Sequence, residues 1–442
     1  MRRLLTVFWL CVLLLAAGGG TCFSACPKEP FSPPDAAYLD LAQFLSRGVP
    51  EMMPSGGNDI DIITSGKQKW EMLMADLEAA HSTICMEYYR WREDAAGNQI
   101  RDIILRKLSE GVQVKILLED MANAFFRIDY YQKMRDAGAQ VQFFTDTDHH
   151  LYEIVPDINY RDHRKIVVID SKVGYIGGMN LGLPNRDVWK DTHVRITGPA
   201  VSQLERLFND MWAAHKGPEL IRMEKKAHAG VPVPESYAES KPAQKPESGP
   251  EYPVKTYPAA FHNKTVQAAT SGAGDNLLEE GVCRILRLSK RYVYIQTPYF
   301  CPSDTLLRAM KDAARRGVDL RILVPAEADS YLMTVVNASF FEECVKAGMH
   351  ILASPGVFNH SKTIVCDDYL STVGTLNMDN RSLRINHEAI ALVYDGEFAA
   401  ACRHLFLSRA EGASQVGEAD IASLPHRRLR AQKFWRGHAR QL

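Results

Sequence analysis

Apolar and polar positions along this chain predict helices and strands in turn. Trp70, Leu73 and Leu77 recur at the spacing of a helix with one buried face. Short apolar runs, which are typical of buried strands, occupy residues 84–91, 111–120, 137–144, 295–302, 317–326 and 347–354. Gly111 and Gly317 stand where helices preceding such runs should end. The alternation of helix and strand predicts an α/β protein.

Two further apolar runs begin with the same polar pattern and reveal an internal repeat. Residues 163–170 read HRKIVVID and residues 360–367 read HSKTIVCD, so both fit HxKxxxxD. A constant offset of 197 residues pairs His163, Lys165, Asp170, Gly177 and Asn180 with His360, Lys362, Asp367, Gly374 and Asn377. The other runs recur in the same order, with Ile84 matched to Ile295. Two copies in register indicate a duplicated unit.

Length and composition fit two lobes. The chain has 442 residues, of which 46% are hydrophobic and 24% are charged, as in an ordinary globular protein. A stretch rich in Pro, Glu, Ser and Lys separates the repeats and has no apolar period, which is typical of a flexible linker. We predict a leader at 1–26, a first lobe at 40–222, a linker at 223–258, a second lobe at 259–412 and a basic tail at 413–442.

The N-terminal residues resemble a targeting segment. Arg2 and Arg3 precede a mostly apolar run at residues 4–17, followed by small residues, as in a signal peptide. The alternatives are an uncleaved anchor, which would keep the two arginines inside, and a lipoprotein leader with Cys26 as the lipidated residue. Each alternative predicts a protein at a bacterial cell membrane with its catalytic lobes on the extracytoplasmic side.

The paired motif predicts a phosphate site. Alternate side chains of a strand share a face, so the histidine and lysine of each motif should project together. If the lobes pack about a pseudo-twofold axis, one pocket contains two imidazoles, two ammonium groups and two amides. The amides belong to Asn180 and Asn377. We expect Lys165, Lys362 and these asparagines to bind phosphate, while His163 and His360 supply nucleophile and acid.

Four carboxylates accompany the motifs. Asp191 and Glu388 each follow a motif histidine by 28 residues, so either could orient an imidazole through its far nitrogen and support a positive charge there. Asp170 and Asp367 complete the candidate catalytic set that the motifs define. Their position at the turn after each strand predicts that they hold local structure rather than touch substrate.

Other polar clusters predict little chemistry. Three of the nine cysteines lie in the leader, and the remaining six stand mostly in apolar segments without CxxC spacing, so we expect neither a disulfide framework nor a zinc site. The HNK stretch at 262–264 lacks the acid of the motif and is not a third copy. DTDHH at 146–150 lies in a stretch that the second lobe lacks, and it reads as a solvated loop. No cofactor and no metal are expected.

The motifs resemble those of the phospholipase D superfamily and, within it, the bacterial cardiolipin synthases. The narrower resemblance rests on EYYRW, NYRDHRKIVVID, GGMNLG, DTHVRITGPAV, QTPYF, GVDLRILVP and VGTLNMDNRS. It implies two similar α/β lobes, each a mostly parallel mixed sheet flanked by helices, packed with pseudo-twofold symmetry. The sequence departs from the usual pattern of the synthases in two ways. It has a single apolar N-terminal segment where they usually have two membrane helices, and it has His387 where they usually have a Phe.

The resemblance also implies a reaction. One histidine attacks phosphorus and the other protonates the departing alcohol, then activates the incoming alcohol, so no metal is required. In the synthases both donor and acceptor are phosphatidylglycerol, and glycerol leaves. By analogy with the superfamily, His163 is the nucleophile and His360 the acid and base, although the near symmetry of the motifs also allows the reverse.

Rival functions share this site. A hydrolytic phospholipase D would use water as the acceptor and release phosphatidic acid. A superfamily nuclease would need a basic groove, and a net charge of −1 offers no such footprint, so we expect no nucleic acid partner. The sequence leaves the oligomeric state open. The C-terminal HRRLRAQKFWRGHARQL mixes basic and aromatic residues, and we expect it to lie on a membrane surface beside the phospholipid substrate.

Overall fold

The computed structural model describes residues 33, 35–123, 128–144, 160–214, 261–272, 274–423 and 425–438. The predicted leader with Cys26, the DTDHH stretch and the predicted linker at 223–258 lie outside the described residues. None of the helices within these ranges combines the length and the apolar character that crossing a membrane would require.

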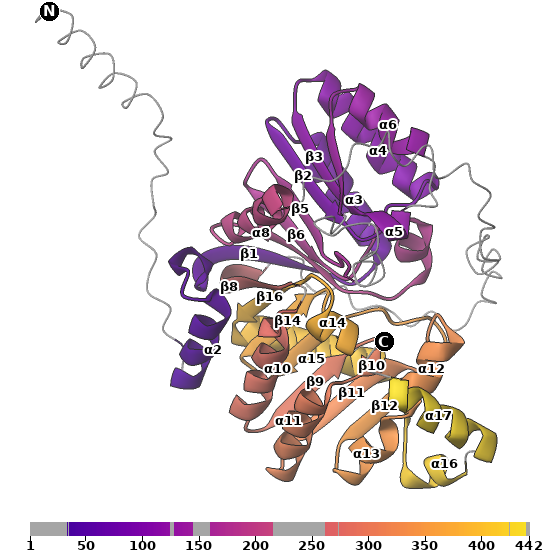
Figure 1. Cartoon of the computed structure of the whole chain (residues 1–442). Coiled ribbons are helices and arrows are strands. Elements are labelled where there is room, and N and C mark those ends of the chain that lie inside the picture. Colours follow the sequence, from indigo (N-terminus) through magenta and orange to yellow (C-terminus); the bar gives the residue numbers. More distant parts are fainter. Residues whose placement is uncertain are drawn as a thin grey trace, which may run out of the picture. The chain divides into compact units, whose positions relative to one another are not determined.

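One sheet passes through both lobes, and within the described residues it has 15 strands (Figure 1). Its order is β17-β12-β11-β9-β13-β14-β16-β8-β1-β7-β6-β5-β2-β3-β4. The two halves meet where β1 (Ser55–Ile63) pairs antiparallel with β8 (Phe261–Ser271). The sequence predicted one sheet per lobe, but the first strands of the two repeats hydrogen-bond to each other, so the lobes share one hydrogen-bonded layer.

The predicted mixed α/β architecture is confirmed. In the first lobe the strands are β2 (Thr83–Tyr88), β3 (Gln113–Glu119), β4 (Gln140–Phe144), β5 (Lys165–Ile169), β6 (Val173–Gly177) and β7 (His193–Thr197). In the second they are β9 (Tyr292–Gln296), β11 (Asp319–Pro325), β12 (His350–Ser354), β13 (Thr363–Cys366), β14 (Leu370–Gly374), β16 (Glu388–Tyr394) and β17 (Ser414–Gln415). A separate two-stranded sheet pairs β10 (Phe300–Cys301) with β15 (Met378–Asp379).

The predicted mostly parallel character of each sheet is wrong, because most of the described strand pairs of the 15-stranded sheet are antiparallel. Parallel neighbours are confined to β2-β3-β4 and β9-β11-β12. These strands are linked by helical crossovers, which parallel pairing requires. The pairs β5–β6 and β13–β14 are hairpins instead. Asp170 and Ser171 in one hairpin, and Asp367 and Asp368 in the other, have φ of 52° to 56°. Two successive residues with positive φ form the tight turn that matches strand twist, so the motif strand must reverse at once and pair antiparallel.

Helices cover both faces of the sheet (Figure 1). The first lobe contributes η1 (Pro50–Met52), α3 (Gly66–Glu78), α4 (Ala95–Ser109), α5 (Asp120–Asn123), α6 (Ile128–Asp136), η2 (Pro184–Val188) and α8 (Val201–Ala214). The second contributes α10 (Leu277–Leu288), α11 (Asp304–Arg315), α12 (Tyr331–Ala338), α13 (Phe341–Lys346), α14 (Asn380–Arg384) and α15 (Gly396–Ala410). The predicted stripe of α3 is buried at Trp70, Leu73 and Leu77, and Ser65 caps its first turn.

The apolar core is shared between the lobes. Phe208 of α8 and Phe398 of α15 belong to a single cluster that lies against strands of both lobes. An early helix, α2 (Ala36–Ser46), packs into the second lobe, where its Leu41 and Leu45 join the cluster that contains Val282 of α10. Apolar burial of this kind, which is the main stabilising contribution in folding, therefore ties the two repeats into one body.

The C-terminal residues are folded against the second lobe as far as the structure describes them. After β17 come α16 (Glu418–Ala422) and α17 (His426–His438). Gln432 of α17 is buried, and the guanidinium of Arg436 lies 3.7 Å from the Phe340 ring centroid and donates to the Ser339 carbonyl at 2.9 Å. Phe434 remains exposed. This basic segment is therefore a docked helix with one outward aromatic side chain.

Hydrogen-bond register corrects one part of the repeat alignment. Ile116 in β3 lies opposite Met86, and its counterpart Ile322 in β11 lies opposite Ile295. Met86, not Ile84, is therefore equivalent to Ile295. A shift of two residues keeps every side chain on the same face of a strand, so the alternation of apolar residues could not reveal it.

Arg409 of α15 joins the lobes from within. It is 8% exposed and donates to Thr192 Oγ1 at 2.8 Å, to the carbonyls of Asp191 at 2.8 Å and Thr64 at 3.2 Å, and to Ser361. Three of these partners belong to the first lobe and Ser361 belongs to the second. Burial lowers the pKa of the guanidinium to about 10, which keeps it charged at neutral pH.

We expect Arg409→Met to lower the free energy of unfolding by about 3 kcal/mol, because it leaves buried acceptors from both lobes without a donor. Thermal denaturation measures the change. Arg403→Met on the same helix removes a side chain that is 45% exposed, with its Nε 3.6 Å from Asp368, and should cost less than about 1 kcal/mol. Equal melting temperatures for the two variants would contradict this role of Arg409.

Candidate active site

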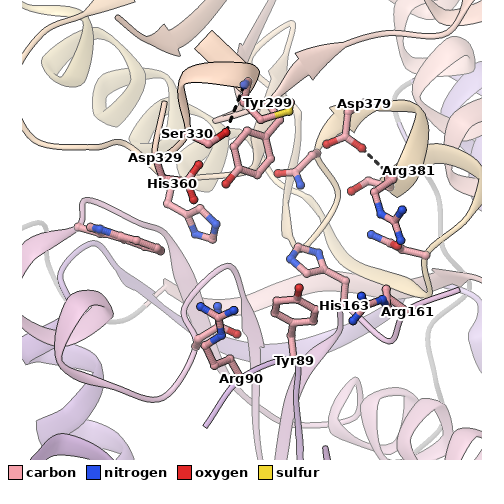
Figure 2. A pocket seen from close by; sticks show the side chains of 16 residues that line it. Tyr89, Arg90, Arg161, His163, Tyr299, Asp329, Ser330, His360, Asp379 and Arg381 are labelled. Carbon is pink, nitrogen blue, oxygen red and sulfur yellow. Dashed lines mark hydrogen bonds between the residues drawn. The ribbon is translucent and has the colours of Figure 1, made fainter. Parts of the chain in front are cut away.

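A pocket of about 670 Å³ contains residues of both lobes (Figure 2). His163 and His360 project into it from opposite sides. Its lining is Tyr89, Arg90, Arg161, His163, Asn180, Trp189, Tyr299, Asp329, Ser330, Met333, His360, Asn377, Asp379, Arg381, Ser382 and Asn386. The structure therefore brings together the predicted histidines and asparagines.

Backbone hydrogen bonds between the lobes hold each histidine in place. His163 precedes β5, and its N–H donates to the carbonyl of His387 at 2.9 Å. His360 precedes β13, and its N–H donates to the carbonyl of Lys190 at 2.7 Å. His387 and Lys190 each come directly before one of the predicted orienting acids. Each motif segment is thus bonded to the acid-bearing segment of the other lobe.

The histidine–carboxylate contacts consequently cross between the lobes. His163 Nδ1 lies 3.0 Å from both oxygens of Glu388, and His360 Nδ1 lies 2.7 Å from Asp191 Oδ2. Because an ionised carboxylate only accepts hydrogen bonds, each contact favours the proton on Nδ1 and leaves Nε2 available for the pocket. The acids lie behind the histidines as predicted, and each one serves the opposite repeat.

The carboxylates are themselves fixed. Glu388 accepts from Thr375 Oγ1, and Asn386 Nδ2 lies 3.3 Å from Glu388 Oε1. Asp191 accepts from the Thr192 N–H at 2.7 Å. Gly178 permits the approach of Asp191, since a Cβ at that position would lie 2.3 Å from Asp191 Oδ1. Gly178, which follows β6 and has no side chain, therefore leaves room for the carboxylate of Asp191.

Burial and neighbouring cations keep both imidazoles neutral in the pocket. The pKa of His360 is lowered to about 4, first by burial and then by Lys362, against the opposing effect of Asp191. The pKa of His163 is also lowered, first by burial and then by Lys165 and Lys362. Burial pushes the pKa of Asp191 upward, but His360, Lys362 and the Thr192 N–H together lower it overall. The sequence predicted support for a charged imidazole, yet two nearby ammonium groups act against it.

Both motif lysines lie beneath the histidines. Lys165 Nζ donates to the His163 carbonyl at 2.5 Å, and Lys362 Nζ donates to the His360 carbonyl at 2.6 Å. Burial lowers the pKa of Lys165 to about 7 and that of Lys362 to about 8. Lys165 also lies 5.2 Å from the ring centroid of Tyr89, which lines the pocket. The ammonium groups thus raise the positive potential of the pocket from just under its surface.

Asn180 and Asn377 occupy equivalent positions beyond β6 and β14 and line the pocket. The side-chain oxygen of each is buried without a hydrogen-bond partner among the described residues. Rotation of the terminal amide exchanges its oxygen and nitrogen, so each side chain can present an acceptor or two donors. Their arrangement suits a ligand with both hydroxyl and anionic oxygens.

Asp170 and Asp367 do not belong to the catalytic set. Asp170 accepts from the N–H groups of His81, Ser82 and Thr83, each at 2.8 Å. Asp367 accepts in the same way from residues 290–292. These carboxylates lie at the far end of the motif strand, about 23 Å from the histidine at 3.3 Å per residue. They fix the start of β2 and β9, which is the local role that their position indicated.

Sequence reasoning missed several pocket residues. Arg161 stands two positions before His163, so the period of two that grouped the histidine with Lys165 could have included it. Trp189 and Asp379 had no such signal, since they reach the pocket from segments whose course depends on contacts between lobes. His360 lies 5.0 Å from Trp189 and 5.8 Å from Phe358, measured between ring centroids.

The remaining clusters lie apart from the pocket. Lys264 of the HNK stretch bonds Asp395 at 3.2 Å and Glu397 at 2.7 Å, so it is not part of a third motif. The six cysteines from Cys85 to Cys402 that the structure describes are buried and unbonded to one another. Across the described ranges, no group of three or more His, Cys, Asp or Glu side chains is arranged to hold a metal ion.

Comparison with known proteins agrees with the geometry. The family model described as "Cardiolipin synthase, PLD-like domain" matches residues 73–212 and 282–409, which is more than half of the chain. The major cardiolipin synthase ClsA of Bacillus subtilis (strain 168) is 32% identical over 76% of this chain and 66% of its own length. Cardiolipin synthase A of Pseudomonas entomophila (strain L48) is 31% identical over 85% of this chain and 74% of its own length.

A solved structure supports the fold. The crystal structure of phosphatidylserine synthase from Haemophilus influenzae Rd KW20 is similar with a TM-score of 0.62 at 16% identity, covering 86% of this chain and 94% of that chain. At that identity the likeness concerns architecture only. The family match, the sequence relatives and the duplicated motif pocket together show that the chain belongs to the cardiolipin synthase family of phospholipase D-like proteins.

Proposed function

We propose that this protein transfers a phosphatidyl group from one phosphatidylglycerol to a second, releasing glycerol and forming cardiolipin. The observation that carries the proposal is the pair of crossed histidine–carboxylate contacts facing one pocket. The names of its relatives, which are cardiolipin synthases, supply the substrate class.

The first half-reaction forms a phosphohistidine. Nε2 of one histidine uses its lone pair to attack phosphorus, and the bond from phosphorus to the glycerol oxygen breaks. The other histidine, protonated on Nε2, gives that proton to the departing oxygen, so glycerol leaves as a neutral alcohol. The resemblance to the superfamily implies that His163 attacks and His360 protonates.

The second half-reaction reverses these movements with a new alcohol. A hydroxyl of the acceptor lipid loses its proton to the acid–base histidine, its oxygen bonds to phosphorus, and the bond from phosphorus to nitrogen breaks. The attacking histidine returns to its neutral form and the acid–base histidine is protonated again. No electrons are exchanged, so the cycle needs no redox partner.

Charge in the pocket prepares the acid. In the empty pocket Lys165 and Lys362 help to keep both imidazoles neutral, since like charges repel. A phosphodiester anion placed between the histidines offsets the ammonium charges and raises the pKa of the histidine that must donate a proton. Glu388 and Asp191 then stabilise the imidazolium through Nδ1, so binding of substrate itself generates the acid form.

Product analysis distinguishes synthase from hydrolase. Purified protein given phosphatidylglycerol in mixed micelles should release glycerol and form cardiolipin, with phosphatidic acid as a minor product, because a pocket that orients the acceptor favours it over water. Mass spectrometry of the extracted lipids measures both products. Mainly phosphatidic acid would identify a phospholipase D, and cleavage of single-stranded DNA without lipid turnover would identify a nuclease.

Histidine variants test the covalent step. His163→Ala and His360→Ala should each lower kcat by about 10³-fold or more, since each removes a group that acts in both half-reactions. Only the variant that retains the nucleophile can accumulate protein-bound label from ³²P-phosphatidylglycerol after an acid quench, and we expect that variant to be His360→Ala.

Asp170→Asn is the matched control for these variants. It alters the same motif at a residue that contacts only a turn, so kcat should stay within about threefold at temperatures where the protein is folded. Near-wild-type turnover in either histidine variant would refute the mechanism. A loss in Asp170→Asn equal to that in His163→Ala would return the carboxylate to the catalytic set.

Domain organisation and location follow from the sequence. We propose that residues 1–26 act as a leader, that 223–258 link the lobes, and that the enzyme acts at the extracytoplasmic face of a bacterial membrane with α17 near the lipid surface. Limited proteolysis should cut first at 223–258 and leave lobes that remain associated, because they share a sheet. Fractionation of cells should recover the protein with membranes. A soluble cytoplasmic protein that keeps residues 1–26 would refute this location.

A further inference from the structure

The residues on the two sides of the pocket differ, although the two histidines at its centre are related by the internal repeat. The 197-residue offset that relates the two histidines also pairs Arg161 with Phe358 and Pro184 with Arg381. Among the described residues, His360 therefore lies beside two aromatic rings, whereas His163 lies beside one, that of Tyr89 at 4.9 Å between ring centroids, and two guanidinium groups line the pocket on its side. Sides that differ in this way can bind different chemical groups.

Arg161 and Arg381 reach the same place from different lobes. Arg161 precedes β5 and Arg381 belongs to α14, and Figure 2 shows both side chains together beside His163. Glu119, which is buried in β3, accepts from Arg161 Nη1 at 2.8 Å and from the Ala122 N–H at 2.5 Å, so this carboxylate positions the first arginine. Burial lowers the pKa of Arg381, and the charge of Arg161 lowers it further.

Two adjacent like charges in a half-buried site are unfavourable unless anions offset them. Glu119 offsets part of this charge through its contact with Arg161. Asp379, also in the lining, has its pKa raised to about 7 by burial, so it offsets this charge only in part at neutral pH. Arginine presents a planar fork of donors that matches the oxygens of a phosphate. The pair therefore has the composition of a phosphate site beside His163.

We propose that Arg161 and Arg381 bind the phosphate of the acceptor phospholipid. The inference rests on the proposed function and adds the position of the second substrate. Only the acceptor brings a second phosphodiester anion, since the departing glycerol and an attacking water are neutral. Three carbons separate its reactive hydroxyl from its phosphate, so the two groups occupy neighbouring subsites. Such a site favours an anionic lipid over water as the acceptor.

The test compares acceptors that differ by one phosphate. The donor is phosphatidylglycerol in mixed micelles, and the acceptors are labelled glycerol, which exchanges with the headgroup, glycerol phosphate, and phosphatidylglycerol itself. Arg381→Gln should lower the ratio of transfer to either anionic acceptor over glycerol exchange by about tenfold or more. Arg381→Lys, which keeps the charge without the fork, should restore part of the loss.

Arg384→Gln is the control, since it removes the same charge from the same helix but outside the pocket lining, where Arg384 Nε bonds Glu279 at 2.8 Å. It should not change the ratio of transfer to exchange. Retained glycerol exchange shows that the Arg381→Gln protein is folded and forms the intermediate. An equal fall in exchange and transfer, or no fall in either, would overturn the acceptor site. Absence of both reactions in the unaltered protein would refute the proposed function instead.

Inorganic phosphate distinguishes a lipid headgroup from a free anion as the occupant. Millimolar phosphate should leave cardiolipin formation by the unaltered protein nearly unchanged, because the site recognises a phosphate attached to the reacting alcohol. Strong inhibition that Arg381→Gln abolishes, together with an unchanged dependence on acceptor concentration, would show a free-phosphate site and overturn the proposal.

Discussion

The active pocket depends on two histidine–carboxylate hydrogen bonds, each of which joins a histidine of one lobe to an acid of the other. Each motif histidine is hydrogen-bonded to an acid of the other lobe, and each is held by a backbone bond to the residue just before that acid. Neither repeat alone could therefore place its imidazole. A shift of one lobe would separate both histidine–carboxylate pairs. The continuous sheet through β1 and β8 and the hydrogen bonds of Arg409 hold the lobes in the position that these pairs need.

Burial of so many ionisable groups near one pocket is tolerable because they alternate in sign. Lys165 and Lys362 lie beneath the histidines, and Asp191 and Glu388 lie behind them. Each ammonium group donates to a backbone carbonyl, and each carboxylate accepts from an imidazole and from a hydroxyl or a backbone N–H. Hydrogen bonding of this kind is the condition under which buried ions persist. The remaining positive potential is directed at the centre of the pocket, where a phosphodiester would complete the charge balance.

The sequence predicted what repeats and periodicity can encode. The constant offset revealed both histidines, both lysines, both asparagines and the two acids, and alternation along a strand placed the histidine and lysine of each motif on one face. The offset could not reveal that each acid contacts the histidine of the other lobe, because the offset would be the same if each acid contacted the histidine of its own lobe. The continuous sheet was missed for a similar reason: pairing of β1 with β8 joins segments 200 residues apart, and no local pattern marks it.

The two repeats differ in sequence at positions near the histidines. Beneath His163 the first lobe buries an ionic contact of Arg164 with Glu87, with Nε to Oε1 at 2.8 Å, whereas the second lobe has Ser361 and Gln296 at the corresponding positions. Identical residues at the offset of 197 include the histidines, lysines and asparagines around the pocket, and also Asp170 and Asp367, which fix turns far from it. Where the halves meet different parts of the reactants they differ, because the lipid that gives the phosphatidyl group and the lipid that receives it are in different chemical states. The unequal sides therefore allow the pocket to bind the donor lipid and the acceptor lipid in different ways.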